Sequence, residues 1–570
     1  MDIDRLSGHD TRRRRNALAC NTCRGRRTKC DGQRPKCSFC AERGKDCFYQ
    51  EPQDLPPSPL KAELLRVWEQ LDHITAAVGG QTPQGSPLTD GQHGYASKTA
   101  RDVSAGFPFM TVQSEAFMSL LGLDQSLSQR FEHIERGRQT FSAQPYGTGV
   151  VMIDLLDALS LLSMFTGQIN TWYPILHAAF LDEFIEAVTS CFPPTVSSCI
   201  TLLVLAIGSA VESESINDTL RNHLDKKYIQ AAMEMLPCVF AESCPRGAQC
   251  LLLFAIYHLC RAQPCQAHDF VAMASYKLQN YIMSELATDD DTSSILGNCF
   301  WSALLIESEL RVQLDLVDSG IWDMTPFAPA PTISSTWPLN QPPSSLAPRT
   351  SGSETYARST DLSYFVAEIA VRKMLQRCTW STSTVAQGRH VYAPIVAAEL
   401  ERQLEVWLQL LPESLSFSRP ACVGSGPSRK PSPAQVEFLR AQYYAFKASI
   451  YWPAVYETLT AGEANGDLLQ HCRRFFSSYA EFVPSAVAAV AVCKPNLWTL
   501  CTSVFTISMA ALTALREPSL LEVAPQGVDQ GLELASKVLD GVMEVSPSLA
   551  QMGGILRERL NLYNSSWAQS

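Results

Sequence analysis

The chain has 570 residues, too many for one compact core, so we expect a large domain with smaller appendages. Its hydrophobic content of 46% indicates that most of it can bury a core. The net charge of −11 is unevenly spread, because residues 1–50 carry +7 (13 Lys and Arg, 6 Asp and Glu) and the remainder carries −18. This asymmetry predicts a polyanion-binding head and excludes that role for the acidic body.

The first fifteen residues, MDIDRLSGHDTRRRR, are charged and hold no apolar run, so we expect no signal peptide. The basic run Arg12–Arg15 is consistent with a nuclear import patch, with an arm that contacts phosphates, or with a plain solvated charge run.

The next element is a cysteine pattern, C-x2-C-x6-C, that occurs twice between residues 20 and 47. Its members are Cys20, Cys23, Cys30, Cys37, Cys40 and Cys47. Three interpretations compete: a disulfide framework, one four-cysteine zinc site with two bystanders, and a shared metal cluster. The disulfide framework requires an oxidising compartment, whereas 13 further cysteines scattered after residue 190 are typical of a reduced one.

Counting metal–sulfur bonds favours the shared cluster. Each zinc takes four ligands, so two zinc ions need eight bonds, which six thiolates supply if two of them bridge. Such a cluster has a net charge of −2, and neighbouring cations would offset part of it. The cations are Arg24, Arg26, Arg27, Lys29 and Lys36.

The segment ACNTCRGRRTKCDGQRPKCSFCAERGKDCFY, with its KCDG-x-RP-x-C loop, resembles the fungal zinc binuclear cluster (Zn2Cys6) DNA-binding domain. The resemblance implies two zinc ions per chain, bridged by Cys20 and Cys37, with Pro35 stiffening the link between the halves. One zinc would take Cys20, Cys23, Cys30 and Cys37, and the other Cys37, Cys40, Cys47 and Cys20.

The same resemblance implies a short helix between Cys23 and Cys30 that enters the major groove at a CGG triplet. It places the base contacts at Arg26 and Arg27; many relatives carry lysine at the second position, but arginine can also grip guanine O6 and N7. The other basic residues are expected to contact phosphates. They are Arg24, Lys29, Arg34 and Lys36.

A Pro-rich linker, 51–58, is followed by apolar residues at steps of four and three, the spacing of a coiled-coil seam of nearly three heptads. Its seam residues are Leu60, Leu64, Val67, Leu71, Ile74 and Val78. We expect a dimerisation helix at 59–78; the alternative is an amphipathic helix packed on the body. Residues 79–107 are polar and Gly/Ser/Thr-rich, which predicts a flexible linker.

From 108 to 570 the pattern predicts helix after helix. Three apolar runs, CITLLVLAIGSAV, CLLLFAIYHLC and WTLCTSVFTISMAALTAL, are interpreted as buried helices and not as membrane spans. One helical face is predicted to hold Phe300, Leu304, Glu307, Leu310 and Leu314, with Glu307 as its polar exception. Two Pro-rich inserts, 324–352 and 418–433, are predicted to be mobile loops.

The body also resembles the fungal transcription-factor regulatory domain, or middle homology region. The segments that carry this likeness are 171–184, 202–210, 300–323, 400–417 and 443–457. One departure is Trp452-Pro453, where the family often has Arg-Pro, so a polar contact made by that arginine would be missing.

The chain shows no catalytic constellation. His177, His258 and His268 lie in or beside apolar helices, where a core histidine is the usual case, and Cys260 and Cys265 lack further metal ligands nearby. Glu307 and Glu309 are two positions apart and do not share a helix face. No Gly-rich phosphate loop, G-x-S-x-G or H-E-x-x-H occurs.

We therefore predict a mainly α protein: a basic arm and Zn2Cys6 domain at 1–50, a short coiled coil, and a large all-helical regulatory domain at 108–570. The function expected is that of a nuclear, non-enzymatic transcription factor of RNA polymerase II genes that binds CGG-type triplets of double-stranded DNA as a homodimer. It would regulate a fungal metabolic or secondary-metabolite pathway. Expected partners are the transcription machinery or co-regulators and a small-molecule inducer, with no membrane. The alternative is a cytosolic helical enzyme or ligand-binding scaffold with a structural zinc appendage.

Overall fold

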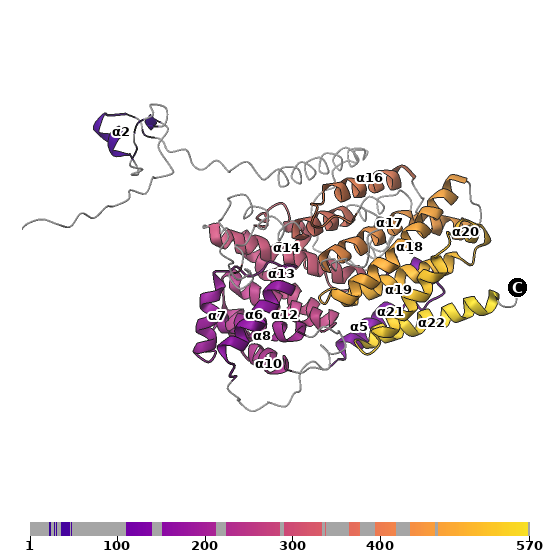
Figure 1. Cartoon of the computed structure of the whole chain (residues 1–570), viewed down its shortest axis with the longest axis horizontal. Coiled ribbons are helices and arrows are strands. Elements are labelled where there is room, and N and C mark those ends of the chain that lie inside the picture. The colour runs from indigo at the N-terminus through magenta and orange to yellow at the C-terminus, as the bar shows by residue number, and fades with distance from the viewer. Residues whose placement is uncertain are drawn as a thin grey trace, which may run out of the picture. The chain divides into compact units, whose positions relative to one another are not determined.

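The computed structural model describes residues 22–23, 28, 30, 36–45, 47, 110–138, 151–212, 224–284, 290–332, 337, 364–376, 394–417, 434–461 and 466–567. The chain divides into two compact units, Met1–Asp90 and Gly91–Ser570 (Figure 1). Helices make up the regular structure of these residues and no strand occurs among them, so the predicted mainly α class is confirmed.

The small unit includes the helix α2 (Ser38–Glu42). The large unit has two groups of helices, which are the purple-to-pink and orange-to-yellow parts of Figure 1. The first group contains α4 (Glu115–Leu120), α5 (Leu127–Arg136), α6 (Leu155–Gln168), α7 (Phe180–Thr189), α8 (Val196–Val211), α10 (Lys226–Glu234), α11 (Leu236–Ala241), α12 (Pro245–Cys260), α13 (Pro264–Met283), α14 (Asp290–Gln313) and the 3-10 helix η2 (Ile321–Met324). The second contains a helix at 364–376, α16 (Pro394–Leu410), α17 (Ala434–Ala461), α18 (Gly466–Val492), α19 (Leu497–Ala514), α20 (Pro518–Val523), α21 (Val528–Gly541) and α22 (Pro547–Trp567).

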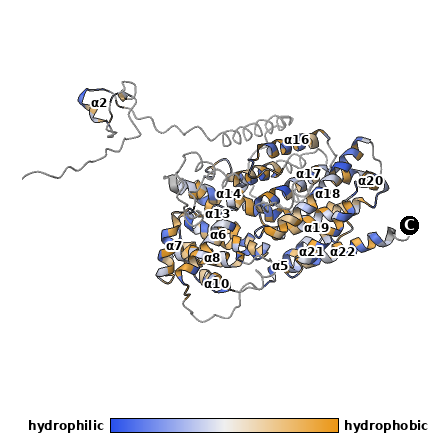
Figure 2. Cartoon of the chain, in the orientation of Figure 1, coloured by the Kyte–Doolittle hydropathy of each residue, from blue (hydrophilic) through white to orange (hydrophobic). Residues whose placement is uncertain are grey.

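The three apolar runs singled out in the sequence form α8, α12 and α19, and each is buried almost all round. Fourteen of the sixteen residues of α8 are buried, which explains why its sequence lacks a polar stripe. Apolar residues colour α8 and α19 orange over much of their visible length in Figure 2. These helices are therefore the core elements on which the amphipathic helices pack, as predicted.

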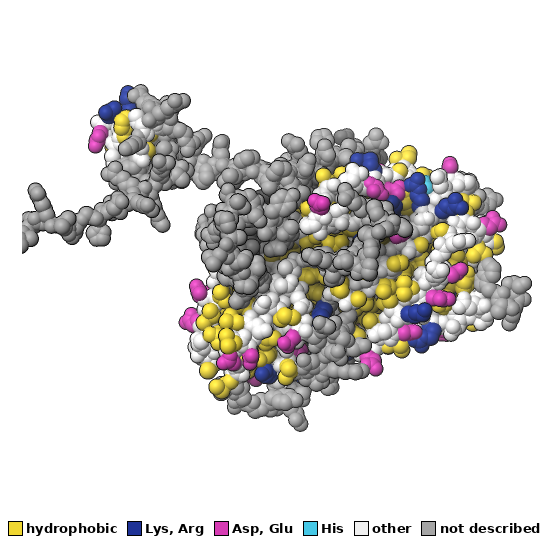
Figure 3. All heavy atoms as spheres, in the orientation of Figure 1, with side chains coloured by type: hydrophobic (Ala, Val, Ile, Leu, Met, Phe, Trp, Pro, Cys, Tyr) yellow, Lys and Arg dark blue, Asp and Glu magenta, His cyan; other side chains and the backbone are white. Residues whose placement is uncertain are grey.

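Among the residues that the structure describes, two helices are long and apolar enough to cross a membrane by length and composition alone, α18 and α19. In the fold, 89% of the most apolar window of α19 and 56% of that of α18 is buried inside the protein. Core helices of a helical bundle can be as long and as apolar as membrane spans, and the burial of α18 and α19 fits that case. Figure 3 shows one face of the molecule, where acidic and basic side chains of the large unit are scattered among apolar ones.

Helix packing joins the two groups into one unit. The helix α8 packs against α6, α10 and α12, and α17 lies along α18, while α14 contacts both α13 and α19. The crossing of α6 and α8 is so close that a Cβ atom on Gly208 would overlap the carbonyl oxygen of Leu161. Glycine is required there because the two backbones approach each other directly.

The predicted buried face of α14 is confirmed, since Phe300, Leu304, Glu307 and Leu310 are all at most 1% exposed. The carboxylate of Glu307 accepts hydrogen bonds from Ser275 Oγ (2.8 Å), from Ser319 N (2.8 Å) and from Ser319 Oγ (2.6 Å). These three donors explain how a carboxylate is tolerated in an otherwise apolar face.

The described start of the Pro-rich insert differs from the mobile loop that we predicted. Residues 325–332 are non-helical but packed on α14: Trp301 Nε1 donates to Pro329 O (2.9 Å) and Thr332 N donates to Asn298 Oδ1 (2.9 Å). Prolines remove backbone donors, and here the remaining polar groups find partners on a helix surface.

Several predictions fall outside the described residues: the linker 51–58, the dimerisation helix 59–78, the linker 79–107, the insert 418–433 and Arg12–Arg15. The boundary between the two units lies at Asp90–Gly91, within the segment expected to be a linker. The proposed limits of the domains remain predictions.

Candidate metal centre

The small unit gathers cysteines from both copies of the repeated pattern. The Sγ atom of Cys23 lies 3.7 Å from that of Cys37 and 4.0 Å from that of Cys40, and all three side chains are fully buried. Cys30 and Cys47 pack against this trio. Five of the six predicted ligands are therefore described and lie together, while Cys20 lies outside the described residues.

The sulfur spacing fits zinc. With Zn–S bonds of about 2.3 Å, two ligands of a tetrahedron lie about 3.8 Å apart. The measured separations of 3.7 and 4.0 Å bracket that value. The thiolates thus have the chemistry and the spacing for Zn²⁺.

The repeat in the sequence is matched by a repeat in the backbone hydrogen bonds. Thr28 N donates to Cys23 O (3.0 Å), and Lys45 N donates to Cys40 O (3.0 Å). Donor and acceptor positions in the second bond are each shifted by seventeen residues, the same offset that separates the two cysteine triplets. Each half therefore folds the same turn beside its cysteine, which predicts equivalent roles for equivalent cysteines.

A backbone donor also supports one of the thiolates. Cys37 N, which precedes helix α2, lies 3.3 Å from Cys47 Sγ and donates to it. Hydrogen bonds of this kind orient metal ligands and stabilise their charge. Cys37 therefore contacts both halves of the repeat. Its side chain lies beside Cys23 of the first half, and its backbone N–H donates to Cys47 of the second.

The predicted DNA-contacting residues are only partly described. Lys36 is exposed, whereas Arg24, Arg26, Arg27, Lys29 and Arg34 lie outside the described residues. The structure adds two exposed cations that we had not singled out, Arg43 and Lys45. Arg43 lies over the ring of Phe39, 4.5 Å from its centroid, and is the repeat equivalent of Arg26, a relation visible in the sequence.

Most of the histidines and cysteines that we considered in the large unit are buried. They are His258, His268, Cys260 and Cys265, while His177 is half-buried. Among the described residues, the trio Cys23, Cys37 and Cys40 is the one group of three metal-ligating side chains brought together. His258 Nδ1 pairs with Gln263 Oε1 at 2.7 Å and His268 Nε2 with Val317 O at 3.0 Å, so both have the core roles that we predicted. Burial raises the pKa of the Cys260 and Cys265 thiols to about 12, which makes them unreactive.

The comparisons with known proteins agree with this centre. Residues 18–56 match the family model for the Fungal Zn(2)-Cys(6) binuclear cluster domain. A protein of Aspergillus rugulosus, provisionally named transcription factor ecdB, is 34% identical over 96% of this chain and 97% of its own. The chain belongs to the fungal Zn2Cys6 family of transcription factors. Members of this family bind DNA and regulate transcription rather than catalyse reactions, and the cluster domain holds two zinc ions.

Shorter matches lie with other regulators. The citrinin biosynthesis transcriptional activator mrl3 of Monascus ruber is 32% identical over 20% of this chain and 24% of its own. The ABC-transporter-regulating transcription factor of Aspergillus oryzae is 46% identical over 8% of this chain and 5% of its own. No solved structure matches the chain.

Proposed function

We propose that this chain is a nuclear, dimeric regulator that reads CGG-type triplets upstream of RNA polymerase II genes of a fungal metabolic or secondary-metabolite pathway. All six repeated cysteines would hold the two zinc ions, with Cys20 and Cys37 as bridges. The observation that carries the proposal is the cluster of Cys23, Cys37 and Cys40 sulfurs at zinc-ligand spacing, flanked by the same turn in both halves.

The division of labour among the basic residues follows from their place in the first half of the repeat. Arg26 and Arg27 would contact guanine edges, because arginine offers two parallel donors to O6 and N7. Arg24, Lys29, Arg34 and Lys36 would contact phosphates and so contribute affinity without sequence choice. The exposed side chains of Arg43 and Lys45 are further candidates for phosphate contact.

The pathway part of the proposal is supported by the names of the relatives. One partial match is a citrinin biosynthesis activator and another regulates ABC transporters. We propose residues 108–570, the candidate regulatory domain within the large unit, as the part that receives a co-regulator or a small-molecule inducer of such a pathway.

Base readout is tested with the full chain on duplexes that carry a CGG triplet or a scrambled one. Arg27→Ala should cost about 1–3 kcal/mol on the CGG duplex and reduce discrimination between the two. Lys29→Ala should weaken both duplexes alike and lower the slope of log K against log salt by about one unit. Fluorescence anisotropy at several salt concentrations measures both. Equal losses for the two variants on both duplexes would contradict this assignment.

Dimerisation is tested on the same duplexes with one or two triplets. Glutamates in place of Leu64 and Leu71 would be buried and unpaired in the seam, so this double variant should be monomeric in sedimentation. It should also lose the preference for paired triplets, since the second contact is no longer intramolecular. Ala62→Glu with Ala76→Glu is the matched control, because both positions lie on the side of the helix opposite the seam. A wild-type chain that is itself monomeric at high concentration would refute the coiled coil.

A further inference from the structure

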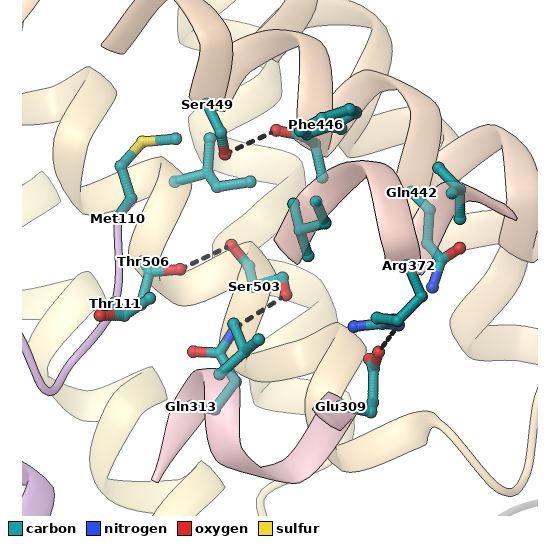
Figure 4. Close-up of a pocket in the computed structure, with 15 residues that line it drawn as sticks. Met110, Thr111, Glu309, Gln313, Arg372, Gln442, Phe446, Ser449, Ser503 and Thr506 are labelled. Carbon is teal, nitrogen blue, oxygen red and sulfur yellow. Dashed lines mark hydrogen bonds and ion pairs between the residues drawn. The ribbon is translucent and has the colours of Figure 1, made fainter. Parts of the chain in front are cut away.

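A buried cluster of charged side chains lies where the helix 364–376 meets α14 and α17. Nη2 of Arg372 donates to Glu309 of α14 and, at 3.1 Å, to Oε1 of Glu368. Gln442 of α17 donates through Nε2 to the same oxygen of Glu368, at 3.0 Å. Figure 4 shows Arg372 between Glu309 and Gln442, with its contact to Glu309 drawn as a dashed line. The cluster therefore joins three helices that are far apart in the sequence.

The charges of this cluster do not balance. Among the described residues, Arg372 is the one cation that forms an ion pair with Glu309 or with Glu368. Two ionised carboxylates (−2) and one guanidinium (+1) would leave a net charge of −1 inside the large unit. Isolated buried charges are costly, and a carboxyl group avoids that cost by taking up a proton.

Burial decides which of the two carboxyl groups takes the proton. The side chain of Glu309 is 19% exposed, whereas that of Glu368 is 5% exposed. Burial is the largest influence on Glu368 and, together with the charge of Glu309, it outweighs the contacts to Arg372 and Gln442, so the pKa of Glu368 is raised. The unbalanced charge therefore falls on Glu368.

The hydrogen bonds of Glu368 and Gln442 are incomplete in a way that one proton would correct. Oε2 of Glu368 and Oε1 of Gln442 are buried and have no partner among the described residues. Both atoms are acceptors as long as the carboxyl group is ionised, so neither can serve the other. A protonated Oε2 is a donor. Since the two side chains already share one hydrogen bond, a second one would pair them as a carboxylic acid pairs with a primary amide.

The other titratable groups around Glu368 do not change this count of charges. They are Tyr173 before α7, Tyr364 at the start of the helix 364–376, and Cys493 after α18. Burial, with the nearby carboxylates, raises the pKa of each of these side chains well above its ordinary value. All three are therefore neutral neighbours, and none supplies the missing positive charge.

We propose that Glu368 keeps a proton in the folded chain at pH values where an ordinary glutamate has lost it, and that its Oε2–H donates to Oε1 of Gln442. The helix 364–376 and α17 are then joined by two parallel hydrogen bonds instead of one. Rising pH removes the proton, which leaves an oxygen of each side chain unpaired and an excess negative charge between the helices. This joint is a pH-sensitive device of the large unit, and it does not depend on the function proposed above.

The effect of pH has the opposite sign to that of an ordinary paired carboxylate. Because the pKa of Glu368 is raised in the folded chain, the folded state binds more protons than the unfolded state as pH rises above 4.5, the ordinary value. The stability that this group contributes is therefore fully present below 4.5 and is lost as pH rises through the folded pKa.

The test compares the full chain with Glu368→Gln, which keeps the shape and both hydrogen bonds of the protonated side chain but cannot ionise. Urea unfolding at a series of pH values gives the unfolding constant of each protein. The ratio of wild type to variant should rise by up to about tenfold for each pH unit above 4.5, until Glu368 ionises in the folded chain. His258 is present in both proteins, so its own titration cancels from the ratio.

The matched control is Glu399→Gln on α16. The side chain of Glu399 is 38% exposed, and a hydrogen bond from Arg402 lowers its pKa, so Glu399 is ionised in both states above pH 4.5. The ratio for this variant should stay constant over the same range. A constant ratio for Glu368→Gln as well would overturn the proposal.

Infrared spectroscopy of the wild type detects the proton directly, and it decides even if Glu368→Gln does not fold. A carboxylic acid band should persist above pH 4.5, and it should be absent from a folded Glu368→Gln. Glu309→Gln removes the excess charge and leaves Arg372 to Glu368, so in this variant the band should disappear at lower pH than in the wild type. No acid band in the wild type, or a band that titrates at the same pH in Glu309→Gln, would overturn the proposal.

Discussion

Substitution of Arg138, just after α5, should lower the stability of the large unit more than most substitutions near its surface. Its Nη1 donates to Glu135 Oε2 (2.9 Å) and to Ala262 O (2.6 Å), and its Nη2 donates to Val545 O (3.1 Å). Glu135 is completely buried and also accepts from Ser546 Oγ and from Ser548 N (3.2 Å). One ion pair therefore joins the end of α5 to the turn before α13 and to the start of α22.

The substitution Arg138→Ala leaves the carboxylate of Glu135 buried without a counter-charge and two backbone carbonyls without a donor. Breaking a buried pair costs about 3–5 kcal/mol. We expect a value near the lower end of that range, about 3 kcal/mol, because the Arg138 side chain is 20% exposed and Glu135 keeps its two serine partners. Arg136, two residues earlier, is the matched control: it is 42% exposed and pairs with Glu132 and Asp269 at the surface, so Arg136→Ala should cost less than about 1 kcal/mol.

Urea unfolding of the full chain, followed by far-ultraviolet circular dichroism, gives the difference between the two variants from the shift in midpoint at an unchanged slope. The double variant Glu135→Gln, Arg138→Met removes the lone buried charge and should be more stable than Arg138→Ala alone. Equal midpoints for Arg136→Ala and Arg138→Ala would refute the reasoning, and so would a double variant that is less stable than Arg138→Ala.

Two further predictions concern the core. Gly208→Ala should destabilise the large unit by about 1–3 kcal/mol, because the added Cβ overlaps Leu161 O where α6 and α8 cross. Gly167→Ala, at an exposed helical site with nothing within 4 Å, should instead stabilise it by about 0.5–1 kcal/mol. The same urea assay measures both, and a loss of stability at both sites would contradict the packing argument. Burial lowers the pKa of His258 from 6.5 to about 4, so the unfolded chain takes up a proton that the folded one does not, and stability should fall by about 3 kcal/mol as pH drops from about 6.5 to about 4. The variant His258→Gln should lose less stability than the wild type over that window in melts at several pH values, and identical pH profiles would show that this histidine is not responsible.

The zinc-binding head was predictable because its structure is determined by local sequence. Metal coordination fixes the distance between sulfurs, so the spacing of Cys23, Cys37 and Cys40 in the chain already constrains how they meet in space. The buried helices were predictable for a similar reason: an apolar run with no polar stripe, as in α8, can be satisfied only by burial on all sides.

The contacts that join the helices were not predictable in this way. Glu135 and Ser546 are 411 positions apart, and Glu309 and Arg372 are 63 apart. In each pair at least one partner lies outside every segment singled out in the sequence. A charged residue in a helix is expected to be solvent-exposed unless its partner is known. The packed segment 325–332 was mistaken for a mobile loop for the same reason, because its partners Asn298 and Trp301 lie on another element.

Trp452, where the resemblance to the regulatory domain led us to expect arginine, packs α4 against α17. Trp452 is 1% exposed, and its ring meets Phe117 of α4 edge-on with centroids 5.5 Å apart. An aromatic side chain at this site therefore fastens the segment that begins at Met110 and Thr111 to α17, where an arginine would need a polar partner instead.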